Sequence, residues 1–216
     1  MPTRTRCTSA RCRVRSVHYG SSRFTSSPVS ATTHAAAMSA PAPVVLITGI
    51  TGFLSAHVLD AVLAAPEGYR VRGTLRSMAK KEALLARLAP QDAHRIELVQ
   101  VAKTESSDLS EAVRGVTYIA HVASPYQLHV EDAERDLLVP AIEGTQNILR
   151  YAAKEASVKK IAITSSFAAV TDFTKGGPNR PGYTYTEQDW NPFERHDAKG
   201  PVAYATSKKL VRDVAP

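Results

Sequence analysis

Cysteine is scarce in this 216-residue chain, which has only Cys7 and Cys12, both close to the N-terminus. Residues 38–216 contain none, so disulfide bonds cannot hold that part of the chain together. The seven histidines are scattered, without cysteines or carboxylates at metal-ligand spacing. We therefore expect no metal site, and the cysteine usage suits a reducing compartment.

Acidic side chains are absent from residues 1–37, which carry six arginines and no lysine. The rest of the chain holds 21 of the 27 basic side chains and all 20 acidic ones, so the formal net charge of +7 comes almost entirely from residues 1–37. Residues 38–216 therefore offer no strongly basic face, and we expect no nucleic-acid partner.

The Arg-, Ser- and Thr-rich composition of residues 1–37 fits a mitochondrial transit peptide. We favour the alternative of a disordered leader or a mis-assigned start, because Met38 lies a few residues before the first predicted strand. The expected location is then cytoplasmic, or mitochondrial if the leader is real.

Long apolar runs are also missing. No charged side chain occurs from Phe24 to Leu59, but Pro41 and Pro43 interrupt this stretch. Its apolar core, residues 44–47, is far shorter than the ~20 residues that a spanning helix needs. We therefore expect no membrane segment.

Short apolar runs alternate with longer amphipathic segments from Val44 onward. The periodicity predicts strands over 44–48, 69–76, 95–101, 116–124 and 159–166. It predicts helices over 55–65, 78–89, 108–115, 131–155 (kinked near Pro140) and 201–215, and an irregular loop over 171–200. This alternation indicates a doubly wound, Rossmann-type α/β domain over residues 38–216, with a parallel sheet covered on both faces.

The sequence TGITGFLS, residues 48–55, lies between the first predicted strand and the first predicted helix. Gly49 allows a sharp turn, and Gly52 leaves room for a pyrophosphate to approach the main-chain amides at the positive end of the helix. This context predicts a dinucleotide-binding loop. Its candidate cofactor contacts are Gly49, Thr51, Gly52, Phe53 and Leu54.

The end of the second predicted strand indicates which dinucleotide is bound. Enzymes that use NAD usually place an acid there to bind the ribose 2′-hydroxyl, whereas this chain has Arg76, followed by Lys80. Arg76 can stack on adenine and pair with a 2′-phosphate. We therefore predict NADP(H) as the cofactor in preference to NAD(H), with Arg76 and Lys80 as contacts.

Six motifs occur in the order TGITGFLS, RGTLRS, HVASP, TSS, YTEQDWNP and YATSK. In this order they resemble the extended short-chain dehydrogenases/reductases, the NAD-dependent epimerase/dehydratase-like family. The resemblance, nearest the dihydroflavonol-4-reductase-like and fungal methylglyoxal/ketone-reductase-like branch, runs from about Val44 to Leu210. Family members continue well beyond this point. The resemblance therefore implies a C-terminally truncated chain, with five strands present and the later strands and substrate lobe missing.

Tyr204 and Lys208 form a Tyr-x-x-x-Lys pair, whose spacing puts both side chains on one face of a helix. Lys208 can then stabilise a tyrosinate electrostatically. The resemblance implies that Ser166, in preference to Ser165, completes a catalytic set with this pair. It also implies that the pair contacts the cofactor and that the backbone of Ala123 and Ser124 skirts the nicotinamide ribose.

His121 is better interpreted as a strand residue packed beside the cofactor than as an acid, and Trp190 as part of the loop or of the pocket wall.

Together the resemblance and these residues imply an NADPH-dependent reductase that converts an aldehyde or ketone to an alcohol. The alternatives are a nucleotide-sugar epimerase or dehydratase that retains NAD, and a non-catalytic NADP-binding module. The expected partner is a small carbonyl substrate, and the oligomeric state stays open. Because a strand would lack its neighbour at the sheet edge, we expect residues 38–216 alone to aggregate or need a partner chain, and to reduce carbonyls poorly.

Overall fold

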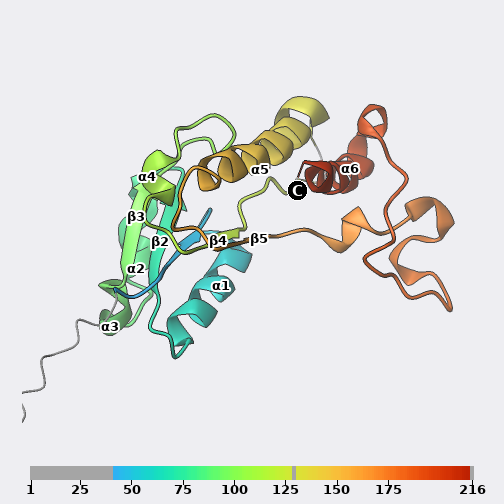
Figure 1. The fold of residues 1–216 in the computed structure, drawn as a ribbon. Coiled ribbons are helices and arrows are strands. Elements are labelled where there is room, and N and C mark those ends of the chain that lie inside the picture. The colour runs from blue at the N-terminus through green and yellow to red at the C-terminus, as the bar shows by residue number, and fades with distance from the viewer. Residues whose placement is uncertain (1–40, 128–129, 215–216) are drawn as a thin grey trace, which may run out of the picture. The chain divides into compact units, whose positions relative to one another are not determined.

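Five parallel strands form a single sheet in the order β3–β2–β1–β4–β5 (Figure 1). The computed structural model describes residues 41–127 and 130–214, so the predictions made for residues 1–37 lie outside the described residues. The strands are β1 Val44–Ile47, β2 Arg70–Leu75, β3 Ile96–Gln100, β4 Tyr118–His121 and β5 Lys160–Ile163. The chain moves outward from β1 to β3 and then crosses to β4 on the other side of β1. This order confirms the doubly wound, Rossmann-type fold.

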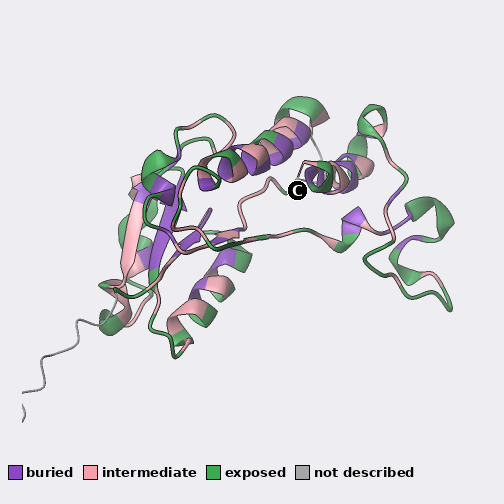
Figure 2. Ribbon diagram, viewed as in Figure 1, coloured by how far each residue is buried: buried purple, intermediate pink, exposed green. Residues whose placement is uncertain are grey.

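Helices cover both faces of this sheet. The described helices are α1 Phe53–Ala64, α2 Lys81–Leu85, α3 Pro90–Ala93, α4 Ser110–Val113, α5 Val139–Ala152 and α6 Gly200–Asp213, of which α6 packs against α5 rather than on the sheet. Figure 1 shows α1 on one face and α4 and α5 on the other. Figure 2 shows burial concentrated in β1 and β2 and on the inner sides of the helices, whereas the 171–199 segment is largely exposed. None of the described helices combines the length and apolar character that crossing a bilayer would require.

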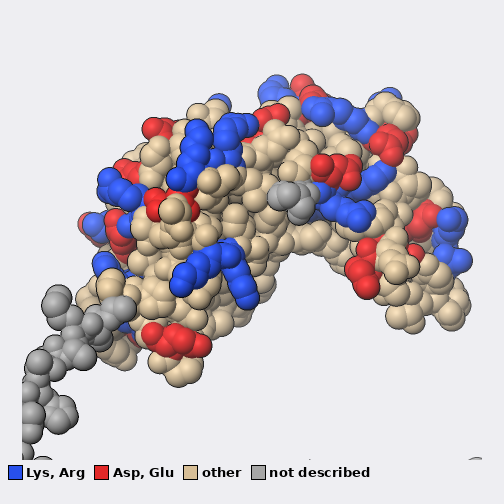
Figure 3. Space-filling view, in the orientation of Figure 1, with Lys and Arg blue, Asp and Glu red and all other residues tan. Residues whose placement is uncertain are grey.

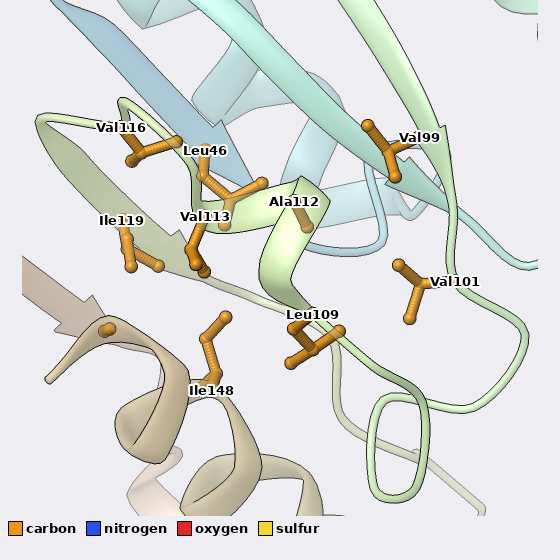
Figure 4. Close-up of a cluster of buried hydrophobic side chains, with 10 residues drawn as sticks. Leu46, Val99, Val101, Leu109, Ala112, Val113, Val116, Ile119 and Ile148 are labelled. Atoms are coloured by element: carbon orange, nitrogen blue, oxygen red, sulfur yellow. The ribbon is translucent and has the colours of Figure 1, made fainter. Parts of the chain in front are cut away.

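The core consists of two layers because successive strand residues point to opposite faces. Val45 and Ile47 of β1 pack with Leu59 of α1 on one face. Leu46, between them in sequence, packs on the other face with Val113 of α4 and Ile148 of α5 (Figure 4). Each fully buried aliphatic side chain of this kind contributes about 1.5–3 kcal/mol. The four-residue strand β1 therefore joins both halves of the core.

The helix predicted over 78–89 was wrong in its length. A 3₁₀ turn, Met78–Lys80, leads into α2, which ends at Leu85, and a separate α3 starts at Pro90. The residue before a proline is disfavoured in the helical region, and Ala89 is extended, with φ −64° and ψ 144°. Pro90 therefore excludes Ala89 from the helix, and α2 itself ends four residues earlier, at Leu85.

The irregularity predicted near Pro140 is present as a change of helix type. Residues Glu134–Leu138 form a π-helical turn in which the Val139 amide donates to the Glu134 carbonyl, and α5 follows. Pro140 has no amide proton, so it cannot make the bond that an α-helix would require four residues back. Residues 171–199 match the prediction of an irregular loop, with three short 3₁₀ turns before α6.

Arg72 is a buried charge in the centre of β2, and its guanidinium is saturated by hydrogen bonds. Its Nε donates to the Glu97 carboxylate of β3 at 2.9 Å. Its Nη1 donates to three main-chain carbonyls at the end of α4, those of Glu111, Ala112 and Arg114, at 2.6–3.3 Å. Arg72 thus caps α4 and joins it to the sheet.

We predict that Arg72→Met lowers the free energy of unfolding by about 2–4 kcal/mol, because the buried carbonyls of α4 lose their donor. Arg70→Met is the matched control, since Arg70 lies on the same strand with its side chain exposed, and we expect a change of about 0.5 kcal/mol or less. Urea denaturation followed by circular dichroism measures both. Equal losses in the two variants would contradict the capping role of Arg72.

Candidate active site

The carboxyl ends of β1, β4 and β5 meet at one edge of the sheet, where the chain order reverses between β1 and β4. Ligands of doubly wound sheets bind in the crevice at such a reversal. The loops that leave these three strands contain the glycine loop, the segment 122–127 and the segment 164–169. The glycine loop, Ala123, Ser124 and Ser166 therefore lie at this edge, whereas Arg76 and Lys80 follow β2, and Tyr204 and Lys208 lie in α6.

The glycine loop is bent tightly against the β4 loop. Gly49 has φ +63°, which favours glycine, and its amide donates to the Thr74 hydroxyl at 2.9 Å. A Cβ added at Gly49 would lie 3.1 Å from the Ala123 Cβ, so a larger residue has no room there. Gly52 caps α1 without a side-chain hydrogen bond. The first amides of α1 are consequently left to an external acceptor.

Apolar side chains are exposed around this loop. Phe53 is 87% exposed and Leu54 45% exposed at the first turn of α1, and Thr51 is also exposed. Behind them Ser55, which replaces the third glycine of the usual pattern, is buried. The loop thus presents free amides and apolar surface on the outside while its inner side packs on the sheet.

Arg76 and Lys80 lie directly after β2, both exposed. The Ser77 hydroxyl between them accepts the Ala79 amide at 3.3 Å and shapes the turn. Among the described residues, no carboxylate pairs with Arg76 or Lys80. The face of the molecule drawn in Figure 3 has a hollow between the segment 171–199 and the part that contains the sheet and α1. Basic and acidic side chains are interspersed on this face.

The β4 loop carries an unsatisfied polar atom. The Ser124 Oγ is buried and has no hydrogen-bond partner among the described residues. Buried hydroxyls normally find a partner, so this oxygen is available to a ligand group at the loop that packs on Gly49. The structure places Ala123 against the glycine loop, and the contact of Ala123 and Ser124 with a nicotinamide ribose stays a prediction.

Tyr204 and Lys208 share one face of α6, as their spacing predicts. The Lys208 Nζ lies 5.6 Å from the Tyr204 ring centroid, and the Tyr126 ring contacts the same tyrosine edge-on at 4.9 Å. Lys208 is 5% exposed and has no ion pair among the described residues, and burial lowers its pKa. An ammonium that lacks a carboxylate partner is available to a ligand hydroxyl and to a tyrosinate.

Asn191 links the segment of Ser166 to this helix. No pattern in the sequence predicted this role of Asn191. The Ser166 Oγ accepts the Ala168 amide at 3.2 Å and caps the 3₁₀ turn Phe167–Ala169, so its proton stays free to donate. Asn191 is 1% exposed, and its Nδ2 donates to the carbonyls of Ala168 and Ala205 at 2.8 and 3.0 Å. One amide group therefore joins the turn after Ser166 to the residue after Tyr204.

Ser165 lines a pocket that Lys208 also lines, whereas Ser166 caps the 3₁₀ turn. A pocket of about 190 Å³ is lined by Ile163, Ser165, Trp190, Lys208, Val211 and Arg212. Trp190 forms part of the wall of this pocket. The Arg212 guanidinium stacks on its ring, 3.7 Å from the ring centroid. Within the described residues, no cluster of three or more His, Cys, Asp and Glu side chains could hold a metal ion.

Comparison with known proteins agrees with this geometry. The sequence pattern of the NAD dependent epimerase/dehydratase family matches residues 45–200. An uncharacterized oxidoreductase of Schizosaccharomyces pombe is 45% identical over 177 residues, covering 79% of this chain and 51% of the relative. The NADPH-dependent methylglyoxal reductase of Saccharomyces cerevisiae is 34% identical over 178 residues, covering 79% of this chain and 51% of that protein.

The crystal structure of yeast methylglyoxal/isovaleraldehyde reductase in complex with NADPH superposes with a TM-score of 0.71. It is 31% identical, and the match covers 80% of this chain and 51% of the yeast chain. The chain thus spans about half the length of the curated relatives that it matches.

We predict that Gly49→Ala destabilises the protein more than Gly68→Ala does. Both glycines have a positive φ, +63° and +66°, so each substitution carries the left-handed backbone cost of about 1–2 kcal/mol. Only at Gly49 does the new methyl group meet a neighbour, Ala123, which adds roughly 1 kcal/mol or more. Urea denaturation compares the two, and identical losses would show that the Ala123 contact is not tight.

Proposed function

The chain belongs to the NAD dependent epimerase/dehydratase family, and from this premise we propose that it is an NADPH-dependent reductase that converts an aldehyde or ketone to an alcohol. The observation that carries the proposal is the buried Lys208 ammonium, which lies beside the Tyr204 ring and is joined through α6 to the turn after Ser166. The names of the yeast relatives, which are reductases of small aldehydes, support it.

The residues at the sheet edge fit a dinucleotide. The Gly49 and Gly52 turn leaves the α1 amides to a pyrophosphate, with Thr51, Phe53 and Leu54 around it. The orphaned Ser124 Oγ and the Ala123 backbone would meet the nicotinamide ribose, and so would Lys208. Arg76 and Lys80 would hold the 2′-phosphate that distinguishes NADPH. When bound, NADPH supplies the hydride that reduces the carbonyl carbon.

The protein's own residues then act on the carbonyl oxygen. The Ser166 hydroxyl, whose lone pair is used in the cap while its proton is free, donates a hydrogen bond that orients the oxygen. The Tyr204 hydroxyl gives its proton to the oxygen as the alcohol forms. Lys208 stabilises the resulting tyrosinate until water returns a proton, because its charge has no carboxylate partner nearby.

Two alternatives are set against this reductase. A nucleotide-sugar epimerase or dehydratase would use the same Tyr204 and Lys208 but retain NAD, which Arg76 disfavours. A non-catalytic NADP-binding module would keep the glycine loop, Arg76 and the ribose contact of Lys208 but have no use for the free hydroxyl proton of Ser166. We place the reductase in the cytoplasm, with the mitochondrion as the alternative if residues 1–37 act as a leader.

Cofactor preference tests the role of Arg76. We predict that this chain binds NADPH more tightly than NADH and that Arg76→Ala removes about ten- to a hundredfold of NADPH affinity, because one charge-assisted contact is lost. Titration of NADPH and NADH fluorescence measures the dissociation constants. Arg87→Ala is the matched control, an exposed arginine of the segment after α2. An Arg76→Ala variant with the parent's preference for NADPH would overturn the assignment.

Turnover tests the role of Tyr204. We predict that, in a full-length version of the protein, Tyr204→Phe lowers NADPH oxidation with methylglyoxal by a hundredfold or more, on the order of the contribution of general acid catalysis, while NADPH binds within about threefold of the parent. Tyr126→Phe, which removes a hydroxyl from the ring that contacts Tyr204, is the control and keeps its rate. Turnover of Tyr204→Phe within a few-fold of the parent would mean that another acid acts. NADPH binding by a parent without turnover would favour the module.

A further inference from the structure

Thr48 connects the two loops of the proposed cofactor site through its side-chain hydroxyl. Its Oγ1 accepts the amide protons of Val122 and Ala123, both at 3.0 Å, and lies 3.0 Å from the His121 Nδ1. Thr48 and His121 are both almost fully buried, and they belong to the ends of neighbouring strands β1 and β4. Three bonds therefore converge on one oxygen at the point where Gly49 and Ala123 approach each other.

Counting protons leaves one arrangement of this group. The Thr48 oxygen uses its two lone pairs for the two amides, so its own proton must point to the His121 Nδ1. Nδ1 is then an acceptor, and the neutral ring carries its proton on Nε2. The Nε2 lies 3.5 Å from the Thr145 hydroxyl of α5, which itself donates to the Ala141 carbonyl at 2.9 Å. Each proton in the chain from Ala123 to Ala141 thus has an acceptor.

We propose that His121 is a positioning residue of the cofactor site: as the neutral Nε2-protonated ring it orients the Thr48 hydroxyl, which holds the Ala123–Ser124 loop against the glycine loop. The proposal rests on the proposed function, because the Ser124 hydroxyl and the Ala123 backbone matter only if they meet a cofactor. A proton on Nδ1 would bring a third donor to the Thr48 oxygen. One of the two loop amides would then lose its acceptor.

The surroundings of His121 keep the ring in this state. The side chain is 4% exposed, and burial together with the nearby charge of Lys208 lowers its pKa to about 4. At neutral pH the ring is therefore neutral, as the proton count requires. His121 accordingly acts through Thr48 and the loop rather than as an acid, which agrees with the sequence interpretation of a histidine packed beside the cofactor.

The first test measures the two loop amides in the free protein. Thr48→Val and His121→Leu should each speed hydrogen exchange of the Val122 and Ala123 amides about tenfold, the effect of one lost hydrogen bond. Thr48→Ser keeps the hydroxyl, and His121→Asn puts an amide oxygen at the position of Nδ1. In both variants the exchange rates of the Val122 and Ala123 amides should therefore stay within about threefold of the parent's. Exchange that is unchanged in His121→Leu would overturn the proposal.

General loosening of the sheet must be separated from release of this loop. The Val71 amide, which donates to the Arg95 carbonyl at 2.9 Å, is the internal reference and should exchange at the parent's rate in all four variants. Faster exchange at Val71 to the same degree as at Ala123 would overturn the proposal. The double variant with Thr48→Val and His121→Leu should match Thr48→Val alone, because both act through one oxygen. Additive effects would count against it.

The second test measures affinity for NADPH by fluorescence. Thr48→Val and His121→Leu should weaken binding about tenfold, and Thr48→Ser and His121→Asn less than threefold. Faster exchange without weaker binding would overturn the positioning role. A parent that binds no NADPH would refute the proposed function instead, and the exchange rates would still decide whether His121 holds the loop.

A third readout concerns the ring itself. In ¹⁵N NMR spectra of histidine-labelled protein, with His121→Asn used to assign the signal, His121 should show a neutral ring protonated on Nε2 at pH 7. A signal from a ring protonated on Nδ1, or on both nitrogens, would overturn the proposal.

Discussion

The close approach of the glycine loop to the loop after β4 is the constraint on which the rest of this site depends. A Cβ at Gly49 would lie only 3.1 Å from the Ala123 Cβ, and Thr48, the preceding residue, binds the amides of Val122 and Ala123. The approach exists because β1 and β4 are neighbours although the 70 residues 48–117 lie between the two strands in sequence. The reversal of strand order thus creates the crevice and also determines which loop backbones line it.

Two buried cations show how differently this fold treats charge. Arg72 donates to the Glu97 carboxylate and to three carbonyls at the end of α4. These bonds stabilise its charge and hold the helix to the sheet. Lys208 has no such partner among the described residues, and burial lowers its pKa. A buried charge without a partner is costly, and such cost is found where a ligand or a developing charge will supply the partner. This contrast separates a structural cation from a candidate catalytic one.

Precise placement of the candidate catalytic groups depends on a residue in the irregular segment. Ser166 follows β5 and Tyr204 lies in α6, two elements with a long loop between them. The Nδ2 of Asn191, within that loop, donates to the carbonyls of Ala168 and Ala205. The backbone amide of Asn191 donates to the Ala169 carbonyl at 2.9 Å. The loop therefore carries the cross-link that an isolated strand and helix could not form.

Three local patterns carried the sequence predictions: the alternating periodicity, the glycine loop between strand and helix, and the spacing of Tyr204 and Lys208. They predicted the parallel α/β fold, the strand positions to within a few residues, and the face shared by Tyr204 and Lys208. The early end of α2 at Leu85 was missed, because the apolar periodicity continues past it to Leu88.

The segments that form strands and helices can be predicted from the sequence, because propensity and periodicity act over a few residues. The distant groups that meet, Thr48 with His121 and Ala123 and Asn191 with Ala168 and Ala205, are known only from the folded chain. It alone left the Ser124 hydroxyl without a partner. The reason is physical, since hydrogen bonding and burial depend on the crossovers that bring segments together, and no local pattern records where those crossovers place a side chain.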